Sequence, residues 1–357
     1  MLIEENKARI YCTDQLNLKL TSNEIDKIID ICEKYNMSDL ISSAYIIKGN
    51  LLYEKNLFND AFLQFNQALY ICDNIHIKDE IFIYNRMGAC KISTLHYEEA
   101  LAYLCKCYSY VVDFNDVNLT CNCIFNLALT YKKLGEFDNA IIYIDKLLDI
   151  CDLNHDFNKY IENIILKANC YLGKNEYHTA IELYTETLNK FNPTISPLSG
   201  IIYNNLGLIY LDINELDKAL KFFKNATLSR ESLDKSTLCR SLIDTSKVYI
   251  KQGLYSEAIE LLEKGIILAN EYGDKEYLLK GYTLLEDAYV ALKDRNKLEE
   301  VYLRSLKALN DIDSCKLLSI YNKLTMINPI YFSHEKRNEL LFNNKSLKNT
   351  GMHFSMI

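Results

Sequence analysis

The sequence lacks the features of a membrane-spanning or exported protein. It contains no run of about 18 apolar residues, which excludes a transmembrane helix. Its first residues, MLIEENKARIYC, mix charged and apolar side chains and therefore lack the apolar core of a signal peptide. The chain carries 12 cysteines without an export signal, which indicates a reducing compartment where they remain thiols. We expect a cytoplasmic protein.

Motifs of enzymes and of nucleic-acid-binding proteins are also missing. The net charge is −8 and no stripe of lysine and arginine offsets it, so direct nucleic-acid binding is not expected. There is no glycine-rich phosphate loop, no G-x-S-x-G and no H-E-x-x-H. The 6 histidines fall in turns, connections and the C-terminal tail. We expect a protein that is not an enzyme and that needs no cofactor.

Proline is scarce, with 3 residues in 357, and two of these mark one irregular connection. Pro193 and Pro197 both fall in NPTISPLSG, residues 192–200. This stretch is expected to be a longer surface loop, with a slight hinge as the alternative.

What the sequence does have is a regular repeat. Alanine recurs at intervals of 39 or 40 residues, at Ala61, Ala100, Ala140, Ala180, Ala219 and Ala258. A small residue stands 12 positions before each one, at Gly49, Gly88, Ala128, Ala168, Gly207 and Ser246. We call these two places the repeat alanine and the small-residue position. Such pairing at a fixed period is typical of a solenoid of stacked units, and solenoids usually bind partners rather than transform substrates.

Each unit is predicted to be a pair of helices. In the fifth unit, apolar residues recur at helical spacing over residues 203–210 and again over residues 216–226. Residues 212–214 form the predicted turn between the two helices. Small side chains at Gly207 and Ala219 allow the two backbones to approach closely, which a leucine at either place would prevent by overpacking.

This pattern resembles the tetratricopeptide repeat. The residues that carry the resemblance are Tyr203, Leu206, Gly207, Tyr210, Ala219, Phe223 and Ala226. It implies an all-α, right-handed superhelical solenoid over residues 1–327, with a C-terminal capping helix and loose tail at 328–357. The eight units are expected near residues 4–38, 42–76, 80–115, 121–155, 160–192, 199–235, 238–273 and 278–310, with a partial ninth at 313–327. The standard repeat has about 34 residues, so longer second helices or connections are implied here.

Four cysteines at C-x-C spacing are the sharpest candidate for a metal site. Cys105, Cys107, Cys121 and Cys123 offer four thiols, which is a ligand set of structural zinc. On a helix, however, residues i and i+2 point about 200° apart, because each residue turns by about 100°. Cys107 also occupies a position that alanine fills in other repeats, which favours a buried packing role. We expect no metal site.

The tetratricopeptide resemblance implies which side chains line the ligand-binding groove, because certain places around the small-residue position face inward in that pattern. These places hold asparagines in the earlier units and charged residues in the last ones. An asparagine amide offers an acceptor and two donors, so it can pair with both polar groups of one peptide unit. The candidate peptide-binding residues are Asn85, Asn126, Asn169, Asn205, Asp244 and Lys247. Because asparagine also caps helices and fills turns, a structural role is the alternative.

Three segments, YNNLGLIY, FNLALTY and YIKQGLYSEAIELL, are similar to the peptide-sensing regulators of Gram-positive bacteria. These form the RRNPP group of Rap, NprR, PlcR and PrgX proteins. A composition rich in Ile, Lys, Asn and Tyr also resembles that of low-GC Firmicutes. The resemblance implies an intracellular sensor of a short signalling peptide, as in quorum sensing, and leaves a homodimer open.

One departure from the RRNPP group concerns its N-terminal domain. Most members carry a helix-turn-helix there, and Rap proteins carry a three-helix bundle. Here the repeats are expected to begin near residue 4, so no DNA-binding domain is expected in this chain. Two other functions stay open: a scaffold that binds a folded protein partner, and a Rap-like effector that acts on a response regulator.

Overall fold

The computed structural model describes residues 21–35, 37–71, 76–114, 116–154, 156–190, 197–308 and 314–332. Over these ranges the chain forms 16 α-helices and two 3-10 helices, and no strand. The prediction of an all-α repeat fold is therefore confirmed. The first helix expected for the first unit, Pro193 and the tail beyond residue 332 lie outside the described residues.

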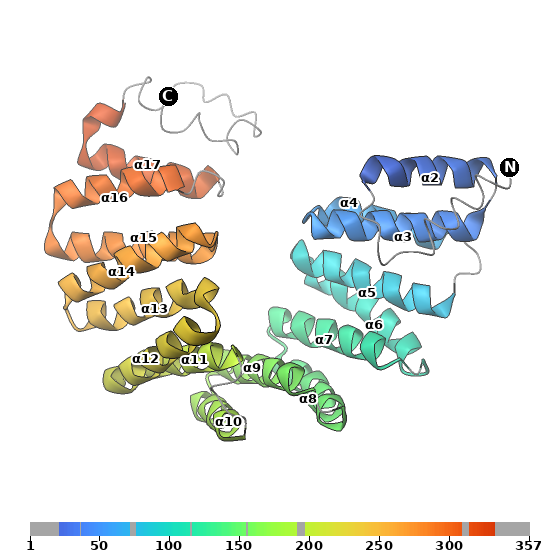
Figure 1. Ribbon diagram of the computed structural model, residues 1–357, viewed down its shortest axis with the longest axis horizontal. Coiled ribbons are helices and arrows are strands. Elements are labelled where there is room, and N and C mark those ends of the chain that lie inside the picture. The colour runs from blue at the N-terminus through green and yellow to red at the C-terminus, as the bar shows by residue number, and fades with distance from the viewer. Residues whose placement is uncertain are drawn as a thin grey trace. The chain divides into compact units, whose positions relative to one another are not determined.

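The chain divides into two compact units, Met1–Leu183 and Tyr184–Ile357, with the boundary inside α10 (Figure 1). The N-terminal unit holds α2 (Ser22–Lys34), α3 (Ser38–Glu54), α4 (Phe58–Ile71), α5 (Ile77–Ser93), α6 (Tyr97–Val111), α7 (Val117–Leu134), α8 (Phe137–Leu153), α9 (Phe157–Gly173) and the start of α10 (Tyr177–Lys190). The C-terminal unit holds the end of α10, α11 (Leu198–Asp212), α12 (Leu216–Leu233), η1 (Lys235–Thr237), α13 (Leu238–Lys251), α14 (Tyr255–Glu271), α15 (Lys275–Leu292), α16 (Arg295–Ala308), α17 (Ser314–Ile327) and η2 (Pro329–Phe332).

Six repeats pair a first helix with a second helix that carries the repeat alanine, and in a seventh Leu298 of α16 stands at that position. The first helices are α3, α5, α7 and α9 in the N-terminal unit, and α11, α13, α15 and α17 in the C-terminal unit. First helices of successive repeats also touch one another, as α5 does α7 and as α13 does both α11 and α15. We call these two series the N-terminal and C-terminal first-helix rows. All six repeat alanines are fully buried, at 0% exposure.

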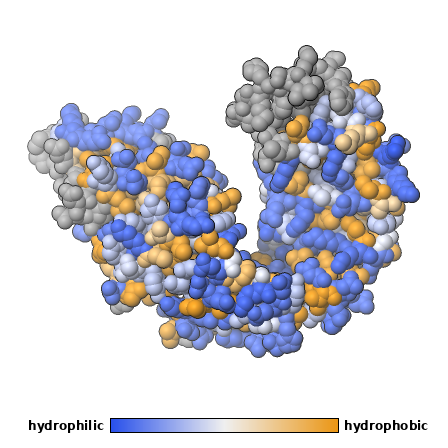
Figure 2. Space-filling view, turned by 180° about the vertical axis from the view of Figure 1, so that it is seen from behind, coloured by the Kyte–Doolittle hydropathy of each residue, from blue (hydrophilic) through white to orange (hydrophobic). Residues whose placement is uncertain are grey.

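The outer surface mixes polar and apolar side chains. Figure 2 shows hydrophilic and hydrophobic residues interspersed over the viewed face. None of the described helices is long and apolar enough to cross a membrane.

A residue with a left-handed backbone conformation lies at the end of the first helix in seven successive repeats. Positive φ angles recur at the 39- or 40-residue interval, at Asn56, Leu95, Gly135, Asn175, Asn214, Gly253 and Lys293. The residue after each one donates its backbone N–H to the carbonyl five positions earlier, as in a Schellman C-cap. Glycine and asparagine adopt this conformation most readily. Several asparagines of the chain are thus turn residues, and the predicted turn at residues 212–214 is one of these places.

Leu95 is energetically unfavourable at its turn position, which requires a left-handed backbone conformation. Its φ of 65° places a branched side chain in the left-handed region, and the side chain is 71% exposed. We expect Leu95→Asn to raise the free energy of unfolding by about 0.5–1 kcal/mol, because asparagine relieves part of a strain of about 1–2 kcal/mol. The midpoint of urea unfolding measures this. Leu63→Asn is the control, since Leu63 is exposed within a regular helix and should gain nothing; an equal gain there would refute the explanation.

The two helices of a repeat pack tightly against each other at the small-residue position. The side chain opposite it stands 16 positions later, on the second helix. A Cβ atom placed on Gly207 would lie 2.6 Å from Cδ1 of Phe223, and one placed on Gly88 would lie 2.6 Å from Cγ of Leu104. A larger residue at either place would force the helices apart, as predicted for Gly207.

We expect Gly207→Ala to lower the free energy of unfolding by about 1–3 kcal/mol through overpacking against Phe223. The double variant Gly207→Ala, Phe223→Ile should recover most of this loss, because it reproduces the Ala128 and Ile144 pair of another repeat, whose members share one core cluster. Thermal unfolding of both variants checks the expectation. A double variant no more stable than the single one would show that the strain lies elsewhere.

Candidate functional site

In the N-terminal first-helix row, two of the predicted site residues bind each other. Asn126 Nδ2 on α7 donates a hydrogen bond of 2.8 Å to Asn85 Oδ1 on α5. Asn85 is buried at 9% exposure, whereas Asn126 is half-buried. The bond occupies one donor of Asn126 and leaves its acceptor and second donor. Asn126 thus retains the groups that a peptide unit requires.

A pocket of about 220 Å³ opens between α7 and α9. Asn122 and Glu162, which hold one repeat position in successive first helices, both line it, together with Phe125. Asn122 lies one helical turn before Asn126, on the same face of α7. The remaining lining residues are Cys121, Leu147, Cys151, Lys159 and Asn163. The pocket thus has a mixed polar and apolar lining and lies one helical turn along α7 from Asn126, which does not line it.

Two further asparagines, Asn169 and Asn50, lie on first helices of the N-terminal row. Asn169 on α9 is half-buried, and its side chain makes no hydrogen bond to any described residue. Asn50 Oδ1 on α3 is buried without a hydrogen-bond partner among the described residues. Neither residue is brought into contact with Asn126.

In the C-terminal unit, Asn205 on α11 binds a buried tyrosine. Its Nδ2 donates a 3.0 Å hydrogen bond to the hydroxyl of Tyr184 on α10. Tyr184 is fully buried, and burial raises its pKa, so the hydroxyl stays neutral. Asn205 is half-buried and, like Asn126, keeps its acceptor and its second donor.

Asp244 is the centre of a buried polar network rather than an exposed site residue. Its side chain is 0% exposed. Oδ2 accepts hydrogen bonds from Asn204 Nδ2 at 2.9 Å and from the Tyr277 hydroxyl at 2.9 Å. Oδ1 accepts one from Lys247 Nζ at 2.6 Å, and Lys280 Nζ lies 4.0 Å from the same oxygen. The network joins α11, α13 and α15, so Asp244 links successive repeats.

Arg230 on α12 extends this network and was not predicted from the sequence. Its Nη1 donates to Asn204 Oδ1 at 3.2 Å and to Ser241 Oγ at 2.6 Å. Burial lowers its pKa, and Nε has no hydrogen-bond partner among the described residues. Gly200 makes room for it, since a Cβ there would lie 2.9 Å from Arg230 Cγ. The sequence does indicate an unusual residue here, because Arg230 stands 11 residues after the repeat alanine. Other repeats hold buried Val111, Cys151 and Ala269 at this position.

The two units use the same inter-repeat bond. In each, the residue three before the small-residue position bonds to the residue two before it in the next repeat. These pairs are Asn85 with Asn126 and Asn204 with Asp244. The shared geometry shows that these positions meet between adjacent first helices.

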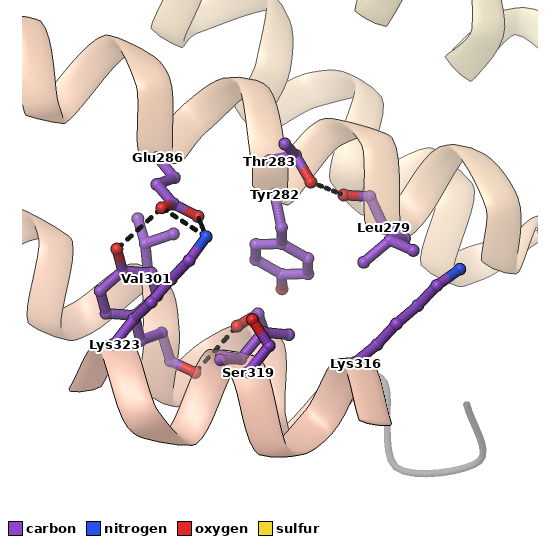
Figure 3. Close-up of a pocket in the computed structure, with 11 residues that line it drawn as sticks. Leu279, Tyr282, Thr283, Glu286, Val301, Lys316, Ser319 and Lys323 are labelled. Atoms are coloured by element: carbon purple, nitrogen blue, oxygen red, sulfur yellow. Dashed lines mark hydrogen bonds and ion pairs between the residues drawn. The ribbon is translucent and has the colours of Figure 1, made fainter. Parts of the chain in front are cut away.

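A second pocket, of about 250 Å³, lies among α15, α16 and α17 (Figure 3). Glu286 occupies the small-residue position of this repeat, where other repeats have Gly, Ala or Ser. Its carboxylate accepts from the Tyr302 hydroxyl at 3.0 Å and from Lys323 Nζ at 2.8 Å. The ring of Tyr282 points from α15 toward Ser319 of α17 in the same view. A polar bridge thus replaces the close apolar contact of the other repeats and leaves a pocket beside it.

Most of the described cysteines behave as packing residues. Cys107 and Cys123 are fully buried, and their Sγ atoms donate to the carbonyls of Ile81 and Leu104 at 3.4 and 3.7 Å. Cys105 is exposed, on the opposite side of α6 from Cys107. Burial raises the pKa of Cys90 to about 12, which keeps it a neutral thiol. No group of three or more potential ligands in the described part of the chain is placed to hold a metal ion.

We expect Asp244→Asn to lower the free energy of unfolding by about 2–3 kcal/mol. This loss is smaller than the loss expected on breaking a fully buried ion pair, because the two lysines that lose their carboxylate, Lys247 and Lys280, are partly exposed. Asp287→Asn is the matched control on α15, where the exposed carboxylate should matter by less than about 0.5 kcal/mol. Urea unfolding of both variants is the measurement, and equal effects would contradict a central role for Asp244.

Comparison with known families identifies the repeat. The tetratricopeptide repeat family model matches residues 122–152 and 201–232, which cover α7 with α8 and α11 with α12. These two helix pairs are tetratricopeptide repeats.

Solved structures with a similar fold include a quorum sensor and a Rap protein. The apo form of the quorum sensor NprR from B. thuringiensis is 19% identical, with a TM-score of 0.59 over 97% of this chain and 99% of that one. The apo form of RapI is 16% identical, with a TM-score of 0.56 over 96% of this chain and 99% of that one. At these identities the likeness shows the fold.

Curated relatives match over shorter stretches. Response regulator aspartate phosphatase J of Bacillus subtilis is 28% identical over 113 residues, which are 31% of this chain and 30% of that protein. Human intraflagellar transport protein 88 homolog is 28% identical over 161 residues, 44% of this chain and 19% of that protein. The chain thus spans less than a third of the length of these two relatives.

Proposed function

We propose that this chain binds a short peptide along its first-helix rows and serves as the sensing part of a peptide-responsive regulator. The observation that carries the proposal is the pocket among α7, α8 and α9, whose lining residue Asn122 lies one helical turn along α7 from Asn126, an amide that keeps its acceptor and one donor. The pocket suits one side chain of a bound peptide, and the amide of Asn126 suits the peptide unit to which that side chain belongs. Asn205 offers the same free groups in the C-terminal unit.

The fold of related proteins supports the same function. One structure of similar fold is NprR in complex with its cognate peptide NprX, with a TM-score of 0.51 at 17% identity over 92% of this chain and 99% of that one. Each neutral hydrogen bond to a peptide would contribute about 0.5–1.5 kcal/mol, so several bonds and one or two filled pockets suit micromolar affinity.

The proposal is tested by affinity selection. A randomised mixture of peptides of about five to eight residues is passed over the immobilised protein, and retained peptides are identified by mass spectrometry. A defined set of retained peptides supports the proposal. If no peptide is retained, or if the immobilised protein captures only folded proteins, the scaffold function replaces it.

We expect Asn126→Ala or Asn205→Ala to weaken the best retained peptide by about threefold to tenfold in calorimetry, the loss of roughly one hydrogen bond. The peptide need not touch both residues, but at least one must respond. Asn139→Ala and Asn270→Ala are the matched controls, because these asparagines are exposed on the second helices α8 and α14. The first-helix assignment fails if the controls weaken binding as much as the two site variants do.

A further inference from the structure

We infer that Cys121 of α7 and Cys151 of α8 form a thiol-modification site, where exchange with a small disulfide joins the two residues by a disulfide bond. The inference goes beyond the proposed function and does not depend on it. It rests on the contact between the two cysteine positions, on the access that a pocket gives to Cys121, and on the polar groups around the two sulfur atoms.

The repeat places the two cysteines against each other. Cys121 stands seven residues before the small-residue position, and Cys151 stands 11 residues after the repeat alanine of the same repeat. Another repeat has Gly200 and Arg230 at these two positions, and there a Cβ atom on Gly200 would lie 2.9 Å from Cγ of Arg230. Side chains at the two positions are therefore in direct contact, which a disulfide requires.

Two other repeats pair the same positions in their cores. Ile81 and Val111 belong to one core cluster, and Cys239 and Ala269 belong to another. The members of each pair are 30 residues apart, as the two cysteines of the proposed site are. Both of these cysteines also line the pocket among α7, α8 and α9, so their side chains border the same space.

The pocket gives a small reagent access to one of the two thiols. Its volume is about 220 Å³, and Cys121 is half-buried at its wall, whereas Cys151 is only 3% exposed. The first exchange therefore takes place at Cys121, and Cys151 is the thiol that completes the disulfide. The neighbouring Cys107 and Cys123 are fully buried, do not line this pocket and donate to backbone carbonyls.

Polar groups beside the two sulfur atoms support the exchange. Asn163 Nδ2 donates to Cys151 Sγ at 3.6 Å, which favours the thiolate form of Cys151. Burial raises the pKa of both thiols, while the positive charge of Lys159 acts against that rise. Asp156, whose carboxylate lies 3.1 Å from Lys159 Nζ, offsets part of this effect. Because the thiolate is the nucleophile, the exchange is expected to take minutes to hours.

The exchange oxidises the two cysteines and reduces one small disulfide, R–S–S–R. The thiolate of Cys121 attacks one sulfur of the reagent, forms a mixed disulfide and releases one thiolate, R–S⁻. The thiolate of Cys151 then attacks Cys121 Sγ, forms the protein disulfide and releases the second R–S⁻. The two protons that the cysteines lose end on the two released thiolates. Disulfides of this kind are transient in a reducing compartment, as befits a redox-sensing site.

The site is tested with oxidised glutathione as the small disulfide. The full chain is reduced and incubated with the reagent, and its remaining thiols are alkylated before trypsin digestion and mass spectrometry. We expect a disulfide between peptides 107–132 and 147–159, the second of which contains Cys151 as its single cysteine. Cys151→Ala should remove this linked pair and leave Cys121 as a mixed disulfide with glutathione. Alkylation of both Cys121 and Cys151 while other cysteines are oxidised would overturn the inference.

Variants assign the partner of Cys151, because peptide 107–132 contains three cysteines. Cys121→Ala should abolish the linked pair, whereas Cys123→Ala, the matched control two residues further along α7, should leave it unchanged. The opposite result would contradict the inference.

Thermal unfolding shows whether the bond fits the native chain. Oxidation should raise the melting temperature of the wild type and leave that of Cys121→Ala unchanged, because the disulfide closes a loop of 30 residues between helices that are already in contact. A melting temperature that falls on oxidation of the wild type would show that the two side chains do not meet in the folded chain, and the inference would fail.

Discussion

The close approach of two helices at the small-residue position is the contact on which the rest of this structure depends. Gly207 against Phe223 and Gly88 against Leu104 leave no space for a Cβ atom. Each such contact fixes the rotation of a first helix about its axis. Because the contact recurs every 39 or 40 residues, equivalent positions of successive first helices face one another. The inter-repeat bond between Asn85 and Asn126 is a consequence.

The polar features arise where individual repeats depart from this pattern. Arg230 replaces a small or apolar side chain on a second helix, and the network around Asp244 forms over it. Glu286 replaces the small residue itself, and a pocket forms beside its bridge to Tyr302 and Lys323. Both departures lie in the C-terminal unit. That unit therefore places charged side chains where other repeats pack small or apolar residues.

Much of the fold could be predicted from the sequence, because the repeat supplies the phase of each helix. The all-α solenoid, the turn at residues 212–214 and the tight packing of Gly207 followed from it. The candidate site was harder to predict, because the repeat phase gives the helix face on which a residue lies. It does not give how deeply the residue is buried or which residue it bonds to. Asp244 thus lies fully buried, and Asn126 is bonded to Asn85. Arg230 would have been found by comparing its repeat position with buried Val111 and Ala269.

A crystal structure of the chain with a peptide retained from the randomised mixture would show which surface binds the peptide. We predict that the peptide backbone lies against first helices, with one of its peptide units bonded to Asn126 or to Asn205. A peptide that lies on the second helices, or that touches neither asparagine, would contradict it.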